Sequence, residues 1–453
     1  MTIVANAPVT FHGPIPSDDT DQPFRGAVSP IGLAEPMLSD LLAAHDYVEE
    51  EYFVSGTVAG QAYRTSLLVR RPADPARFSG LVALETVHVQ GALGLWQTSH
   101  DAIFQSGHGW VAIGSQRMGI EGPVKMTNPA RYAALTVPTA DLAASEQATA
   151  ALMQWSQSQS GAVPTEVFAV DAVSNAIMTQ VGAALKAGAE GGPFGRNPIA
   201  CLLMGGASQT GGATLNYIKE AHVEARLPDG GPIYDGFLPM AAPGWQAVKG
   251  GDAAVIHIYA EGDLILFESI GPEGVVSARP DSDAADDRYR CYEVTGASHL
   301  PTRGLVDGTG IPQLGLTLDP GDRFLQIPFA PFAQAAFVNL VDWVRDGRLP
   351  PRARRIEMAK DEMVRDAFGN AKGGLRSPYV DLPTARYEPA KYLRHLIGAE
   401  MPFPSEQLHE LYASRADYLQ RFDRGIDALV EARWITLADG ETLKTDEAAH
   451  PPF

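Results

Sequence analysis

The residues with the clearest chemical potential lie in the segment MGGASQTGG, residues 204–212. An apolar run typical of a buried strand comes before Ser208, and a helical pattern follows it. This placement predicts a strand-to-helix turn, a nucleophile elbow, which exposes the serine hydroxyl. Gly206 and Gly211 supply the small neighbours that such a crowded, strained turn needs. We therefore expect Ser208 to be a nucleophile.

Two neighbours of the serine refine this prediction. Thr210 stands where a strict G-x-S-x-G elbow has glycine, so a plain glycine-rich turn between strand and helix is the alternative. The backbone N–H of Gln209 follows the serine at the start of the predicted helix, where partial positive charge gathers. We expect it to be one donor of an oxyanion hole, the site that stabilises a developing negative oxygen.

A serine nucleophile needs a base, and His299 has the best position among the eleven histidines. It lies in the segment GASHLP, after the strand-like run 289–294 and a glycine turn. In serine hydrolases of α/β type, the catalytic residues occur along the chain in the order serine, acid, histidine. His299 satisfies this order, and the alternative is a structural histidine in a loop.

Two carboxylates compete for the role of the acid that orients the histidine. The segment AAVIHIYAEGD, residues 253–263, is a buried strand pattern that ends in Glu261 and Asp263. The spacing beyond the strand favours Asp263, with Glu261 as the alternative. The spacing alone does not decide between them.

The loop after the third strand, TVHVQGALGLW, is the usual source of a second oxyanion donor. We expect a backbone N–H of Gln90 or Gly91 to serve, although the segment also fits a plain entry into a helix. His88 in the same loop is a candidate to contact the substrate.

An apolar substrate pocket is predicted from Trp96, Met240 and Trp245. The last two belong to GFLPMAAPGW, residues 236–245, which we expect to follow a sixth strand and to face the active site. The alternative is that these side chains are ordinary core residues.

The surrounding pattern predicts how these residues are positioned. Residues 46–58 and 63–71 are rich in β-forming types and predict an opening antiparallel pair. Short apolar runs then alternate with helix-length patterns, which indicates a mostly parallel α/β sheet with helices on both faces. The expected buried strands are 80–87, 109–115, 198–204, 253–260 and 289–294, and the expected helices are 96–106, 138–157, 168–187, 211–223 and 331–346.

The last hundred residues have a different pattern, rich in turns and poor in periodicity. We expect a catalytic domain over 1–349 and a C-terminal extension over 350–453. The extension is predicted to be an irregular wrap with two or three helices within 405–430. A separate second domain is the alternative.

Composition limits the classes of partner. The chain has 453 residues, 45% of them hydrophobic, with 35 Lys+Arg against 54 Asp+Glu and a net charge of −19. This acidity and the lack of a basic cluster argue against nucleic acid or a membrane as partner. We expect a small-molecule ester or lactone instead, while assembly into a homo-oligomer stays open.

The sequence predicts neither a metal nor a cofactor, since no Cys/His cluster has metal spacing and residues 204–212 lack the P-loop lysine. Cys201 and Cys291 lie in apolar runs, as reduced core residues do. With no export signal in the first residues, we expect a cytoplasmic location.

These motifs together resemble the α/β-hydrolase superfamily, and more narrowly the uncharacterised bacterial alpha/beta hydrolase domain-containing proteins. The similar segments span nearly the whole chain: EEEYFVSGT, LVALETVHVQG, GWVAIGSQRMG, NPARY, GGASQTGG, YAEGD, EVTGASH and RDAFGNAKGGLRSPYVDLPTARY. The resemblance implies the α/β-hydrolase fold. It also implies a nucleophile at Ser208, an acid at Asp263 or Glu261, and a base at His299.

The sequence therefore predicts a serine hydrolase that cleaves a carboxylic ester or lactone through an acyl-enzyme. The same catalytic groups could serve an acyltransferase or a thioesterase. A non-catalytic binding protein that retains the fold is the alternative from another class.

Overall fold

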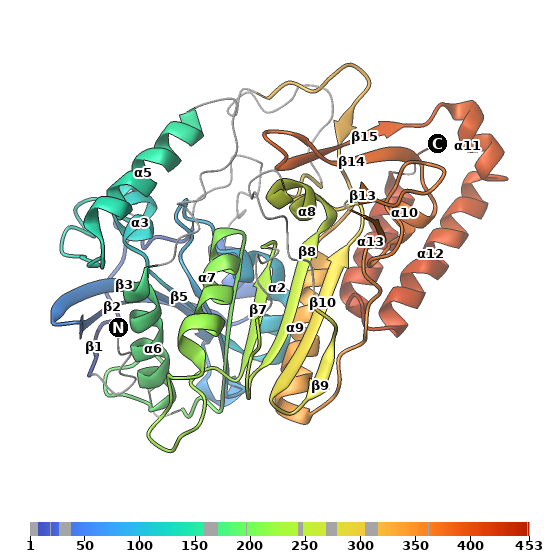
Figure 1. The fold of residues 1–453 in the computed structure, drawn as a ribbon. Helices are drawn as coiled ribbons and strands as arrows, with labels where there is room; N and C mark the ends of the chain where they lie inside the picture. The colour runs from blue at the N-terminus through green and yellow to red at the C-terminus, as the bar shows by residue number, and fades with distance from the viewer. Residues whose placement is uncertain are drawn as a thin grey trace.

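The computed structural model describes residues 8–18, 20–26, 38–157, 171–195, 197–242, 248–268, 279–303, 316–360, 362–450 and 452. Within these ranges the fold is built around a ten-stranded sheet, with strand order β1-β2-β3-β5-β4-β6-β7-β8-β10-β9 (Figure 1). The strands are β1 Thr10–His12, β2 Tyr47–Val58, β3 Gln61–Pro72, β4 Leu81–Thr86, β5 Gly109–Ile113, β6 Cys201–Ala207, β7 Gly236–Met240, β8 Ala254–Ala260, β9 Ser282–Ala284 and β10 Asp287–Val294.

The sheet is parallel in its centre and antiparallel at both edges. Strands β5, β4, β6, β7, β8 and β10 pair in parallel, whereas β1, β2 and β3 form the antiparallel side and β9 turns back on β10. Every residue of β4, β5, β7 and β8 is buried, as expected of strands covered on both faces. The predicted fold class is confirmed.

Helices cover both faces of this sheet (Figure 1). Helices α2 and α9 contact each other on one face, and α6 and α7 lie on the other, with α7 packed on β6 and β7. The principal helices are α1 Leu38–Ala44, α2 Gly94–Ser106, α5 Leu142–Gln157, α6 Ala172–Lys186, α7 Gln209–Tyr217, α8 Glu261–Glu268 and α9 Ala330–Asp346. The short helices α3 Arg117–Gly119 and α4 Lys125–Thr127 follow β5.

One predicted element has a different place. The segment GFLPM, expected to follow a strand, is itself strand β7, between β6 and β8. Met240 therefore ends a strand directly beside the serine turn. The apolar composition that indicated a pocket instead reflects burial on both faces of the sheet.

The C-terminal extension contains more regular structure than the sequence indicates. A small sheet has the order β11-β15-β14, and a two-stranded hairpin and four helices complete it. Strand β11 Arg323–Phe324 of this sheet comes before residue 350 and so belongs to the expected catalytic domain. The elements of the extension are β12 Met358–Ala359, β13 Glu362–Met363, α10 Pro378–Asp381, β14 Ala385–Tyr392, β15 Ile397–Pro402, α11 Ser405–Leu411, α12 Arg415–Glu431 and α13 Leu437–Ala449. In Figure 1 helices α11, α12 and α13 lie beyond the β10 side of the large sheet, whereas β14 and β15 lie above α8, which β14 contacts.

A buried carboxylate fixes the start of α2 relative to the sheet. Glu85 on β4 is fully buried and accepts hydrogen bonds from the backbone N–H groups of Leu95 and Trp96 at 3.0 and 2.8 Å. The indole N–H of Trp110 is its third donor, at 3.0 Å. The guanidinium of Arg70 lies over the rings of both tryptophans. Because both ends of the loop between β4 and α2 are held, the residues in this loop have a fixed position at the sheet edge.

Replacing Glu85 with Gln should remove a pH dependence of stability. Burial raises the pKa of Glu85 to about 7 from its ordinary 4.5, so between these values the folded protein keeps a proton that the unfolded chain has lost. The stabilising contribution is complete below pH 4.5 and is lost as the pH rises through about 7. In urea unfolding, wild type should lose on the order of 3 kcal/mol over this range relative to Glu85→Gln. Parallel stability profiles for the two proteins would contradict this.

Candidate active site

Ser208 occupies a strained turn between β6 and α7. Its backbone has φ 57° and ψ −124°, a conformation that residues other than glycine rarely adopt. Its N–H donates to the carbonyl of Met240 at 3.0 Å, and its carbonyl accepts from Gly212 at 2.9 Å. The predicted strand-turn-helix geometry of a nucleophile elbow is present.

The neighbours of Ser208 show why small residues are needed here. A Cβ atom on Gly206 would lie 2.6 Å from the carbonyl oxygen of Thr210, and one on Gly211 would lie 2.2 Å from that of Met240. Thr210, which replaces the usual glycine, has a bonding role of its own. Its hydroxyl accepts from the N–H of Ala207 and donates to the carbonyl of the same residue, each at 2.9 Å. The threonine thus closes the turn from the inside.

The structure brings Ser208, His299 and Asp263 together. The serine Oγ lies 3.0 Å from His299 Nε2, and His299 Nδ1 lies 2.5 Å from Asp263 Oδ1. The second carboxylate oxygen, Oδ2, accepts the backbone N–H of Ala260 at 2.6 Å. Because the acid is fully buried and accepts the Nδ1 hydrogen, the neutral imidazole presents an unprotonated Nε2 to the serine hydroxyl.

Glu261 lies in the same helical turn as Asp263 but bonds to different groups. Its carboxylate accepts the backbone N–H of Gly296 at 2.8 Å and pairs with Arg365 of the C-terminal extension at 3.2 Å. Burial raises the pKa of Glu261, and the bonds to Gly296 and Arg365 counter part of this effect. The carboxylate beside the imidazole is therefore that of Asp263, and Glu261 ties the histidine loop to the extension.

The loop after β4 does not supply the oxyanion donor that was expected from Gln90 or Gly91. The N–H of Gln90 donates to His88 Nδ1 at 3.0 Å, and the N–H of Gly91 donates to the carbonyl of His88 at 2.7 Å. Both amides are used within their own tight turn, so the expected second oxyanion donor is not available from either in this conformation. The N–H of Gln209, by contrast, has no acceptor within the described ranges.

The residues predicted to line a substrate pocket have different locations. Trp96 is 1% exposed and packs against Trp110 and Arg70, so it is a core residue. The Met240 side chain is also fully buried, with its sulfur 3.6 Å from the hydroxyl of Thr98. Trp245 lies outside the described residues. The expectation of pocket residues at Trp96 and Met240 was wrong because Trp96 lies on the side of α2 that packs on the sheet, and Met240 ends a strand that is buried throughout.

One residue missed by the sequence reasoning supports the elbow directly. The side-chain amides of Gln116 and Gln209 form a reciprocal pair, with N···O distances of 3.1 and 2.6 Å, and both residues are buried. Gln116 follows β5 and so reaches the serine turn from a strand that is not its neighbour. The signal in the sequence that could have identified Gln116 was a polar residue directly after the predicted buried strand 109–115.

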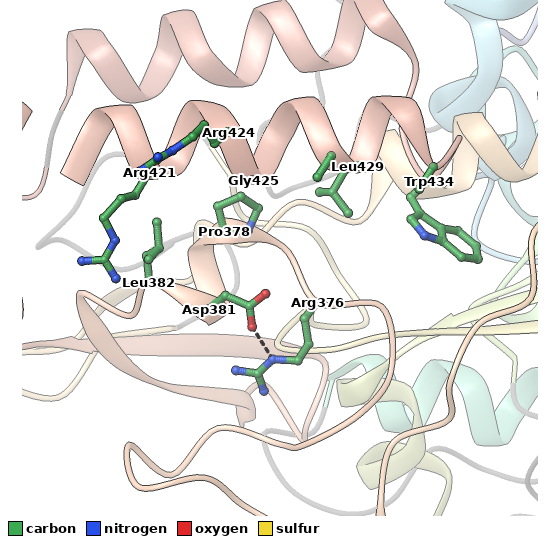
Figure 2. Close-up of a pocket in the computed structure, with 11 residues that line it drawn as sticks. Arg376, Pro378, Asp381, Leu382, Arg421, Arg424, Gly425, Leu429 and Trp434 are labelled. Carbon is green, nitrogen blue, oxygen red and sulfur yellow. Dashed lines mark hydrogen bonds and ion pairs between the residues drawn. The ribbon is translucent and has the colours of Figure 1, made fainter. Parts of the chain in front are cut away.

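A cavity of about 470 Å³ lies in the C-terminal extension, away from this chemistry. Figure 2 shows it between α10 and α12, with Arg421, Leu382 and Trp434 among its lining residues. Arg376 at its edge is paired with Asp381 at 2.6 Å. None of its lining residues belongs to the serine, histidine and aspartate group.

Among the described residues, no cluster of histidine, cysteine and carboxylate side chains is arranged to hold a metal ion. In the same part of the chain, no helix has the length and apolar character needed to cross a membrane. Cys201 and Cys291 are both free and buried in strands.

Sequence comparison identifies the family. The chain matches a family described as "Alpha/beta hydrolase domain" over residues 11–445. The chain belongs to this alpha/beta hydrolase domain family. No curated protein sequence matches it.

Several solved structures are similar to this family member at low identity. A promiscuous CE15 esterase from a marine bacterial metagenome is 10% identical, over 64% of this chain and 81% of the other, with a TM-score of 0.29. A poly(3-hydroxybutyrate) depolymerase from Bordetella parapertussis is 11% identical, over 66% and 91%, with a TM-score of 0.30. A glucuronoyl esterase from Solibacter usitatus is 11% identical, over 64% and 94%, with a TM-score of 0.25. These similarities do not indicate a substrate, and the family assignment rests on the match over 11–445.

The role of Thr210 in this alpha/beta hydrolase domain can be tested by two substitutions. Thr210→Val keeps the shape but removes the hydroxyl, which leaves the N–H of Ala207 without its partner. We expect a loss of about 1–2 kcal/mol in the free energy of unfolding. Thr210→Ser keeps the hydroxyl and should lose less than half as much. Equal losses for the two variants, measured by urea unfolding, would show that the hydroxyl does not hold the turn.

Proposed function

We propose that this protein is a serine hydrolase that cleaves a carboxylic ester or lactone through an acyl-enzyme intermediate. The observation that carries the proposal is the continuous hydrogen-bonded series from Ser208 Oγ to His299 and on to Asp263. Membership of the alpha/beta hydrolase domain family supports hydrolysis as the reaction class.

In this proposal His299 acts twice. It first takes the hydroxyl proton as Ser208 Oγ attacks the carbonyl carbon, and it then gives that proton to the leaving alcohol oxygen. Water repeats the sequence on the acyl-enzyme and releases the acid. The buried Asp263 carboxylate keeps the ring in the required tautomer and offsets the positive charge that the ring gains.

The environment of the serine favours this chemistry. The left-handed turn exposes Oγ at the carboxyl edge of the parallel strands, where the first turn of α7 begins. The N–H groups of that turn carry partial positive charge. The Gln209 N–H is the natural first donor to an oxyanion, because it follows the serine directly and the Gln116 amide fixes its side chain.

Replacing Ser208 with Ala should abolish ester hydrolysis without loss of the fold. We expect turnover of an activated aryl ester to fall by about 10³-fold or more. A fluorophosphonate probe should label wild type at Ser208, located by peptide mass spectrometry, and should leave Ser208→Ala unlabelled. Labelling at another serine, with full activity in the variant, would refute the proposed nucleophile.

The two neighbouring carboxylates should respond differently to amide substitution. Asp263→Asn is expected to lower turnover by about 10²–10⁴-fold, because an amide N–H in place of an acceptor favours the wrong tautomer of His299. Glu261→Gln should lower turnover far less and act mainly on stability, since its partners are Gly296 and Arg365. Kinetics with one ester and thermal melting of both variants check this. A larger kinetic loss in Glu261→Gln would reverse the two assignments.

A further inference from the structure

His88 lies at the same level of the sheet as Ser208. Strands β4 and β6 are parallel neighbours, with Glu85 opposite Gly205. His88 lies three residues after Glu85, and Ser208 lies three residues after Gly205. The chain after β4 still follows β5 at Val87, whose N–H donates to the carbonyl of Ile113 at 2.9 Å. His88 therefore starts its turn at the carboxyl edge of the sheet, one strand away from the serine.

A hydrogen bond sets the tautomer of His88. The N–H of Gln90 donates to Nδ1 at 3.0 Å, so Nδ1 carries a lone pair and the neutral ring has its hydrogen on Nε2. Burial, and then the nearby His299, lower the pKa of His88 to about 4. The ring therefore remains a neutral N–H donor above about pH 5.

The Nε2–H of His88 has no hydrogen-bond partner within the described part of the chain. The atom is not enclosed, although the residue as a whole is only 8% exposed. A donor that is held by its own loop and still accessible is available to a bound molecule. The two backbone amides of the same loop, those of Gln90 and Gly91, are already used.

We propose that the side chain of His88 is the second oxyanion donor, with its Nε2–H directed at the carbonyl oxygen of the ester and the Gln209 N–H as the first. This inference rests on the proposed serine hydrolase function. As the Ser208 Oγ–carbon bond forms, the carbonyl π pair moves to oxygen and the serine proton moves to His299 Nε2. His88 keeps its proton and only donates a hydrogen bond. Collapse restores the carbonyl bond and expels the alcohol, which takes the proton from His299.

The first test compares His88→Met, which has no donor, with His88→Gln, which retains one. With p-nitrophenyl acetate, His88→Met should lower kcat by about 10²–10³-fold while KM changes less than about threefold. His88→Gln should regain about tenfold or more of that loss. A kcat within threefold of wild type in His88→Met, or a loss seen only in KM, would overturn the proposal.

A matched control is available at the opposite edge of the sheet. His108 is also buried, its pKa is also lowered to about 4 by burial, and it precedes β5 at the amino end of the parallel strands. His108→Gln should leave kcat within about threefold of wild type. If both His88 variants fail to fold in circular dichroism while His108→Gln folds, His88 is structural and the proposal is wrong.

A thionoester separates oxyanion stabilisation from general positioning. Sulfur accepts hydrogen bonds poorly, so wild type should favour the oxygen ester, and His88→Met should reduce this preference about tenfold. An unchanged preference would overturn the assignment of His88. If instead Ser208→Ala hydrolyses both esters as fast as wild type, the proposed function itself fails, which is a distinguishable result.

Discussion

The position of Ser208 in a left-handed backbone conformation is the constraint on which the rest of the site depends. Holding a residue other than glycine there costs on the order of 1–3 kcal/mol, so the surrounding structure must stabilise it. The parallel neighbour β7 supplies the carbonyl of Met240 for the serine N–H, and the Thr210 hydroxyl closes the turn beneath it. The close approach of Gly211 to that same carbonyl lets α7 begin at once. The exposed hydroxyl is therefore a consequence of strand packing, and the histidine only has to reach it.

Asp263 and Glu261 show how two buried carboxylates in one helical turn are kept apart in function. Asp263 faces the imidazole, whereas Glu261 faces the N–H of Gly296 and a cation from the C-terminal extension. The pairing with Arg365 offsets a charge that would otherwise stand close to the base in a region of low dielectric constant. The extension is thus electrostatically coupled to the site through this ion pair.

The sequence was informative where chemistry follows from chain order and strand burial. Ser208, Asp263 and His299 each follow a buried parallel strand, and the carboxyl ends of such strands meet at one edge, so their convergence could be expected. The bonding of Gln90 and Gly91 could not be expected, because it depends on the local turn, in which the Gln90 N–H donates to the His88 side chain and the Gly91 N–H to the His88 carbonyl. The small sheet of the extension was also missed, since β14 contains Pro389 and pairs with β15 through an irregular register. Trp96 was wrongly predicted to line a pocket, because the sequence does not distinguish an aromatic residue at a binding site from one in the core.

Two imidazoles near one serine would interfere with each other if both could become charged. In the structure the two rings differ in the hydrogen-bond partner of Nδ1. His299 Nδ1 donates to a carboxylate, whereas His88 Nδ1 accepts a backbone N–H, a bond that a proton on Nδ1 would break. In the proposed mechanism the ring that accepts the serine proton is therefore the one that has a carboxylate partner. In our proposal the proton taken from the serine is held on His299, where the leaving group can receive it, and the His88 ring stays neutral beside the developing oxyanion.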